Sequence, residues 1–181
     1  MTAVRDVVGT SALDALDRID PIDPIDEAHR QWVAHGWAEA ADGMAAITSI
    51  MRAQQIALAR VDAVLKPRGL TFARYELLML LTFSRRGTLP MNRIGRLLQV
   101  HPTSVTNAVD RLQSAGLVER GPHPTDARST LVSLTATGRG TALAATTELN
   151  DRVFAAPRLA PSRVRSLLST LRAYRRGADP A

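Results

Sequence analysis

Two short helical patterns joined by a tight turn, within residues 90–138, constrain the fold of this chain most. In the first pattern, apolar residues recur at steps of three and four, as one buried helical face requires, at Met91, Ile94, Leu97 and Leu98. Pro90 suits the first turn of this helix, where its missing N–H removes no hydrogen bond. After a break at residues 99–101, Pro102 opens a second helix with the same apolar spacing at Val105, Ala108, Val109 and Leu112. The sequence therefore predicts a helix-turn-helix.

The other face of the second helix is polar. It carries short hydrogen-bonding side chains and one long cation, at Thr103, Ser104, Thr106, Asn107, Asp110 and Arg111. Such groups can contact the base edges and phosphates of DNA. We expect the contacts of this helix at Pro102, Thr103, Ser104, Thr106, Asn107 and Arg111, with Asn107 bound to an adenine. Since Asn is common on exposed helices, a solvated Asn107 is the alternative.

A hairpin is expected to follow the second helix. Gly116 suits a left-handed cap at the end of that helix, and residues 117–120 read as the start of a strand. Residues 121–128 contain two prolines and a glycine and are predicted as a loop. Alternation over residues 131–134 predicts the return strand, and Thr135 suits the N-cap of the next helix. The fold class predicted is mainly α with a small β-hairpin wing, a winged helix-turn-helix.

This region contains an ordered set of short motifs, namely Leu112-x-x-Ala115-Gly116-Leu117-Val118-x-Arg120, then Asp126-x-Arg128, then Leu134-Thr135-x-x-Gly138. The set resembles the MarR family of bacterial transcriptional regulators. The resemblance covers roughly residues 38–176. It implies that the helix from Pro102 enters the major groove and that Arg128 reaches the adjacent minor groove. It also implies that Asp126 holds the wing by an ion pair, whereas the alternative for Arg128 is a solvated loop charge.

The charge of the chain is unevenly distributed. The formal net charge is +6, but residues 1–28 carry −5 and the remainder carries +11. A basic body suits the phosphate backbone of double-stranded DNA, although arginine can also serve only to solubilise a surface. We expect phosphate or minor-groove contacts from the arginines near the two helices and the wing, namely Arg85, Arg86, Arg111, Arg120 and Arg128.

The chain is expected to have four parts. Residues 1–25 form an acidic arm whose prolines forbid a continuous helix. Residues 26–66 form N-terminal helices for dimerisation, a short one over 26–37 bearing Trp32 and Trp37 and a long one ended by Pro67. Residues 67–138 form the winged helix-turn-helix domain, centred on an apolar helix over 71–83. Residues 139–176 form C-terminal dimerisation helices.

The last predicted helix has an apolar face that needs a partner. Its stripe consists of Val164, Leu167, Leu168, Leu171 and Tyr174, and one small winged-helix body offers too little surface to bury it. The resemblance implies a homodimer in which the first and last helices interlock. Such a dimer presents two reading helices to a pseudo-palindromic operator, with half-sites about 10 bp apart.

The resemblance also implies a small-molecule ligand, anionic or phenolic, that releases DNA. A tryptophan-bearing N-terminal helix is similar to the urate-responsive branch of the family, and Trp32, Glu76 and Arg120 match three of the residues used there. Ala108 stands where that branch has an arginine, which argues against urate. Alternatively, Trp32 and Trp37 merely cover the core.

Several classes of protein are excluded by what the sequence lacks. There is no cysteine, so disulfides and thiol oxidation are excluded. No run approaches the roughly 18 residues of a membrane span, and the acidic N-terminus does not resemble a signal peptide, so we expect a cytoplasmic protein without membrane contact. The four histidines lack metal-like spacing, and His101 suits a helix cap or a phosphate donor. No phosphate loop or nucleophile motif appears, so neither a cofactor nor an enzyme is expected.

The prediction for the whole chain is a homodimeric repressor that binds DNA sequence-specifically and is released by a ligand. The alternative is a winged-helix module that binds proteins without specific DNA binding.

Overall fold

The computed structural model describes residues 23–123 and 129–177, and the chain divides into two compact units, Met1–Ile56 and Ala57–Ala181. The first unit contains α2 (Pro24–Ala34) and most of α3 (Ala38–Leu65). Asp23 caps α2 by accepting a hydrogen bond from the Ile25 amide at 2.8 Å. The helix begins two residues earlier than predicted, because Pro24 occupies its first turn, where proline favours a helix.

The chain turns between α2 and α3 at Gly36, whose φ of +85° favours glycine. The prediction that Trp37 lies within the first helix was therefore wrong, since α2 ends at Ala34 and Trp37 follows the turn. Trp37 packs edge-on against Trp32, with ring centroids 5.2 Å apart. The His29 Nε2 and Asp42 Oδ1 atoms, 2.8 Å apart, join the two helices beside this turn.

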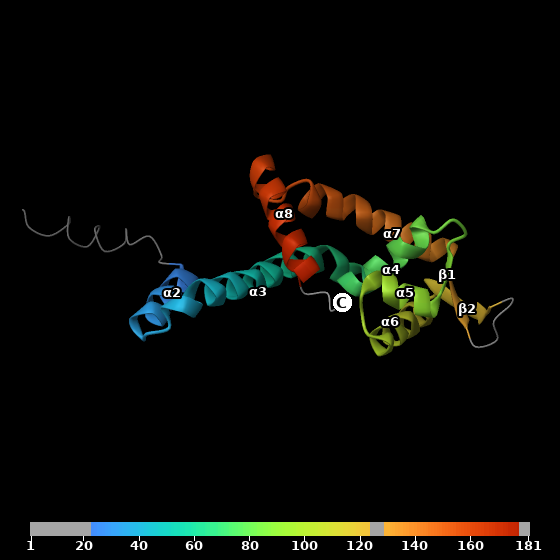
Figure 1. The fold of residues 1–181 in the computed structure, drawn as a ribbon. Helices are drawn as coiled ribbons and strands as arrows, with labels where there is room; N and C mark the ends of the chain where they lie inside the picture. Colours follow the sequence, from blue (N-terminus) through green and yellow to red (C-terminus); the bar gives the residue numbers. More distant parts are fainter. Residues whose placement is uncertain (1–22, 124–128, 178–181) are drawn as a thin grey trace, which may run out of the picture. The chain divides into compact units, whose positions relative to one another are not determined.

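The second unit is built around α4 (Phe72–Phe83). Leu77, Leu78 and Leu81 are fully buried in this helix, as its nearly continuous apolar sequence predicts. The 3₁₀ turn η1 (Lys66–Arg68) precedes it, and Thr71 caps it by accepting from the Arg74 amide. It packs against three further helices, α5 (Met91–Leu98), α6 (Pro102–Ser114) and α7 (Ala136–Leu149), and the last of these runs along it in Figure 1.

The wing is a three-stranded antiparallel sheet in the order β1-β3-β2. The strands are β1 (Thr88–Pro90), β2 (Val118–Pro122) and β3 (Thr130–Leu134). The hairpin of β2 and β3 confirms the prediction, except that β2 continues through Gly121 and Pro122, which had been assigned to the loop. An edge strand tolerates proline because its missing N–H removes no ladder bond on the open side.

Strand β1 was not predicted. Its three residues are too few to show alternation, and Pro90 had been assigned to the following helix. In the structure Pro90 ends β1 and serves as the N-cap of α5. Thr88 pairs with Ser133, and their hydroxyl oxygens lie 3.0 Å apart.

Two C-terminal helices follow the wing. Between α7 and α8 (Pro161–Gly177) lies the π-helical turn η2 (Asn150–Phe154). No residue of α8 is buried, and Leu167, Leu168 and Tyr174 are each about half exposed, at 46%, 52% and 52%. Most of the predicted apolar stripe therefore stays exposed in the described part of this chain, whereas Val164 and Leu171 are partly buried.

The start of α7 is locked onto the turn between α6 and β2. The Thr135 hydroxyl donates to the Gly116 carbonyl at 2.8 Å and accepts from the Gly138 amide at 2.9 Å. The Thr135 amide donates to the Leu117 carbonyl at 3.2 Å. A Cβ on buried Gly138 would lie 2.0 Å from that carbonyl oxygen, so only glycine permits this approach.

We predict that Gly138→Ala destabilises the protein by at least about 2 kcal/mol, because backbone must move to admit the methyl group. Gly140, two residues further along the same helix, has open space around its Cα. Gly140→Ala should therefore raise stability by up to about 1 kcal/mol. Urea unfolding of both variants measures the difference, and equal effects of the two substitutions would contradict the packing.

Glu148 near the end of α7 joins two arginines from other parts of the unit. Its carboxylate bonds to Arg152 on η2 and to Arg68 at 2.7 Å, and Arg68 also donates to the Val64 carbonyl at 3.1 Å. The hydrogen bond from Arg152, together with the hydrogen bond and the charge from Arg68, lowers the pKa of Glu148. This cluster fastens the end of α3 to the end of α7.

Because the pKa of Glu148 is lower in the folded state, the cluster stabilises the fold above the unfolded pKa of about 4.3 and loses this contribution in acid. We predict that Glu148→Gln lowers the melting temperature at pH 7, and that the difference from the parent protein shrinks below the unfolded pKa and vanishes as the pH falls through the lowered pKa of the folded state. Thermal melts across pH measure this, with Glu119→Gln, at an exposed site, as the control. A difference in melting temperature that stays constant with pH would show that the ionised Glu148 carboxylate does not stabilise the fold.

Candidate nucleic-acid interface

Helix α6 presents opposite chemistries on its two faces. Val105, Val109 and Leu112 are buried in the core, and Ala108 is half-buried beside them. The polar residues predicted for the other face are all exposed, namely Thr103, Ser104, Thr106, Asn107, Asp110 and Arg111. Because the apolar face is fixed in the core, the polar face has one orientation.

The turn before α6 is tightly defined. Gln99 ends α5 with a left-handed φ of 54°, and the Val100 amide donates to the Gly95 carbonyl at 3.2 Å. The His101 Nδ1 atom accepts from the Thr103 amide at 3.3 Å, which confirms the prediction of a capping role. A Cβ on Gly95 would already touch the Val105 side chain at 3.4 Å, so a small residue lets α5 and α6 pack closely.

Arg120 bridges the wing to α6. Its Nη1 atom donates to Asp110 Oδ1 at 2.5 Å and to Gln113 Oε1 at 3.1 Å, while Nη2 donates to the Thr106 carbonyl at 3.4 Å. The side chain is only 26% exposed. The sequence predicted that Arg120 contacts DNA or a ligand. It did not predict that Asp110 binds Arg120, because a contact between a helix and a strand follows no fixed residue spacing.

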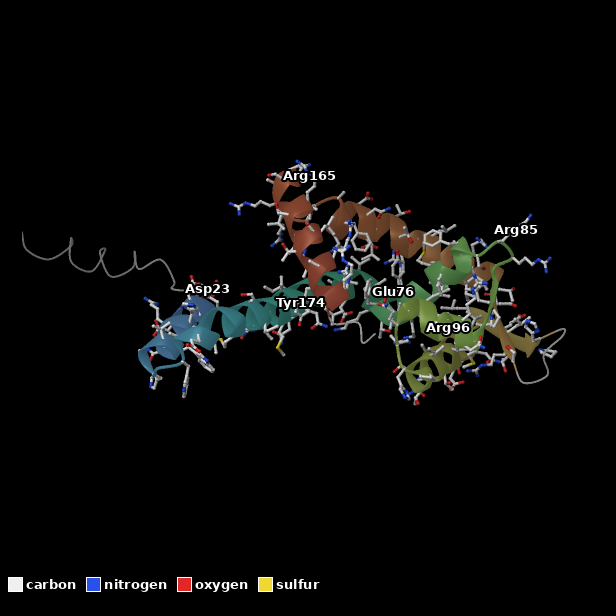
Figure 2. All side chains as sticks on the ribbon, viewed as in Figure 1. Asp23, Glu76, Arg85, Arg96, Arg165 and Tyr174 are labelled. Atoms are coloured by element: carbon white, nitrogen blue, oxygen red, sulfur yellow. The ribbon has the colours of Figure 1, made fainter. Side chains whose placement is uncertain are left out.

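Exposed arginines lie on α5, which packs against α6, and in the loop between α4 and β1. Arg85 and Arg86 lie in the loop between α4 and β1, and Arg93 and Arg96 lie on α5. Figure 2 shows Arg85 projecting from its loop and Arg96 on its helix. The sequence pattern did not predict contacts from the two α5 arginines, because it defined the first helix only by its buried apolar face. Asp126 and Arg128, predicted for the wing, lie outside the described residues.

A hollow of about 610 Å³ opens beside α6. It is lined by Asn92, Arg96 and Gln99 from the α5 side, by Pro102 and Thr106 from α6, and by Thr130 of β3. None of the described residues that line it is a carboxylate. The hollow thus joins the helix-turn-helix and the wing into one surface that an anionic polymer can approach without repulsion.

A second pocket, of about 450 Å³, lies on the α4 and α7 side of the unit and contains Glu76. Partial burial raises the pKa of this carboxyl. Of the three residues predicted for a ligand, Glu76 lines this pocket and Arg120 does not. Trp32 lies in the first unit, against Trp37.

Metal clusters and membrane-spanning helices are both absent from the described part of the chain. Within residues 23–123 and 129–177, no group of three or more His, Asp or Glu side chains could hold a metal ion. No helix in the same residues is long and apolar enough to cross a membrane.

The comparisons with known proteins agree with this geometry. Residues 68–129 match the model of the MarR family. The crystal structure of Sco5413, a MarR family transcriptional regulator from Streptomyces coelicolor, is 52% identical, with a TM-score of 0.70 over 76% of this chain and 95% of that one. This chain belongs to the MarR family. The family prediction made from the motifs is confirmed.

Two other MarR family structures contain DNA. Sco3205 from Streptomyces coelicolor, in complex with DNA, is 26% identical, with a TM-score of 0.68 over 78% of this chain and 90% of that one. A mutant MarR from E. coli, complexed with operator DNA, is 25% identical, with a TM-score of 0.64 over 70% of this chain and 91% of that one. The comparison with curated proteins gives no significant match.

We predict that Arg120 and Asp110 of this MarR family protein are energetically coupled. A double-mutant cycle with Arg120→Ala and Asp110→Ala should give a coupling of about 0.5–1 kcal/mol in unfolding free energy, as for a partly exposed ion pair. The matched cycle pairs Arg120→Ala with Asp151→Ala on η2, where additive effects are expected. Additive effects in both cycles would mean that the bridge contributes nothing to the position of α6.

Proposed function

We propose that this regulator binds a pseudo-palindromic operator as a homodimer, with α6 of each subunit in the major groove. The observation that carries the proposal is the polar face of α6, which is exposed along its length while the opposite face is buried. A helix fixed in this way offers the same side chains to every DNA molecule, as sequence reading requires.

The side chains of α6 have distinct tasks in the proposal. Ser104, Thr106 and Asn107 contact base edges, and Pro102 and Thr103 place the helix start against the backbone. The Thr106 hydroxyl already donates to the Pro102 carbonyl at 3.2 Å. It therefore serves DNA as an acceptor, which suits the amino groups of adenine or cytosine.

The arginines supply affinity that is independent of sequence. Arg111, Arg85, Arg86 and Arg96 bind phosphates, and Arg128 reaches the minor groove with Asp126 holding the wing, as the family resemblance implies. We assign Arg120 a positioning role for α6, because three hydrogen bonds join its guanidinium to acceptors on that helix.

The exposed stripe on α8 supports the dimer. Leu167, Leu168 and Tyr174 on one helix form an apolar surface that a partner subunit would cover. Two reading helices related by a two-fold axis then meet half-sites about 10 bp apart. We further propose that the dimer acts in the cytoplasm as a repressor, since a protein bound at a promoter excludes the polymerase, and that a small ligand releases it.

We predict that Asn107→Ala weakens binding to the operator about 10- to 100-fold, as expected for one lost base contact. The DNA is the region upstream of the protein's own gene, and the measurement is fluorescence anisotropy. Binding to a scrambled duplex should be unchanged. Thr147→Ala, at an exposed threonine of α7, is the control and should bind as the parent does. Equal losses on both duplexes would remove Asn107 from base reading.

We predict that Arg128→Ala lowers DNA affinity and reduces the slope of log affinity against log salt by about 0.9, the effect of one lost phosphate contact. Light scattering should still give the mass of two chains, because the substitution lies in the wing region. Unchanged DNA affinity would favour a winged-helix module that binds proteins instead.

A further inference from the structure

Gln99, in the turn between α5 and α6, has a backbone conformation that is costly for a residue with a side chain. It is one of two described non-glycine residues with a left-handed φ, at 54°, and the other is Arg158 at 57°. Glycine is the usual residue at such a helix end, because a Cβ is crowded there. Strain of this kind is concentrated at functional sites. A glutamine at this position therefore indicates a task for its side chain.

The side chain of Gln99 lines the hollow beside α6. Asn92 and Arg96 line it from α5, as does Thr130 from β3 of the wing, and Figure 2 shows Arg96 on its helix. The side chains of Asn92, Arg96 and Gln99 are exposed and form no hydrogen bond or ion pair with any described residue. Their N–H groups are therefore available to an incoming acceptor.

The surroundings of the hollow favour an anion. Helix α5 contains Arg93 and Arg96 but no Asp or Glu, and the one carboxylate of α6, Asp110, is bound to Arg120. The volume of about 610 Å³ is in the range of sites for drug-sized molecules and exceeds what one phosphate group needs. The hollow thus has room for a short stretch of sugar–phosphate chain.

The proposed DNA complex requires such a chain at this place. In that complex α6 lies in the major groove and the wing in the adjacent minor groove, and one sugar–phosphate backbone separates these two grooves. That backbone must pass between α6 and the wing. The hollow is lined by Pro102 and Thr106 of α6 and by Thr130 of β3, so it lies on this path.

We propose that the hollow holds the backbone between the two grooves, and that the Gln99 side-chain amide donates a hydrogen bond to a phosphate there, beside Arg96. This deepens the proposed function, on which it rests, by adding Gln99 to the residues that bind DNA. A phosphate contact adds affinity without sequence preference. Because the amide is neutral, it neutralises no phosphate and leaves the salt dependence of binding unchanged.

Gln99→Gly separates the two effects of this residue. Glycine accepts the left-handed φ, so the midpoint of urea unfolding should rise, whereas loss of the phosphate contact should weaken DNA binding. We expect binding about tenfold weaker, by fluorescence anisotropy, to the duplex from upstream of the gene and to a scrambled duplex alike, with an unchanged salt slope.

Arg158→Gly is the matched control. Arg158 has nearly the same φ and is exposed, but it lies between η2 and α8 and does not line the hollow. Its replacement by glycine should also raise the midpoint of urea unfolding, because it relieves the same backbone strain. It should leave binding to both duplexes unchanged.

A second variant detects the phosphate itself. Gln99→Lys places a positive charge at the same backbone position, so DNA affinity should be at least that of the parent protein. The slope of log affinity against log salt should steepen by about 0.9 for each phosphate contacted. A change in the flexibility of the turn would not steepen this slope.

The inference is overturned if Gln99→Gly binds both duplexes as tightly as the parent, if its loss is confined to the upstream duplex, or if Gln99→Lys leaves the salt slope unchanged. Tight binding of the upstream duplex by the parent, together with any of these results, removes the role of Gln99 and leaves the proposed function standing. A parent protein that binds neither duplex removes both proposals.

Discussion

The burial of α4 determines how the elements packed against it are oriented. Leu77, Leu78 and Leu81 are fully buried, and each such side chain contributes about 2–3 kcal/mol relative to exposure. Helix α6 packs its apolar face into the same core. The polar face of α6 must then point outward, so the proposed DNA-reading surface is a consequence of core packing. Any substitution that lets α6 rotate would alter DNA recognition without touching a DNA contact.

The sequence predicts a helix well where the residues of that helix alone mark its start and its buried face. Pro102 and the spacing of Val105, Val109 and Leu112 locate the start of α6 and its buried face, because a proline start and a periodic face are both local signals. Strand β1 was missed because three residues carry no period. The role of Arg120 was missed for a different reason. Its partners Asp110 and Gln113 are set by how β2 crosses α6, which is a tertiary arrangement.

The ligand residues show the same limit. Sequence similarity grouped Glu76 with Arg120, but the structure gives Arg120 to α6 and leaves Glu76 among aromatic side chains. The net charge of a pocket depends on which side chains line it. Tertiary packing decides this, and it cannot be predicted from composition or from residue spacing. Leu98 belongs both to this pocket and to the end of α5.

In the proposed complex, a two-fold dimer reads DNA through paired α6 helices. Hydroxyl-radical footprinting of the full chain on the DNA upstream of its gene would show this arrangement. We expect two protected stretches related by a dyad, with centres about 10 bp apart on one face of the duplex. A single protected stretch, or protection without dyad symmetry, would contradict it.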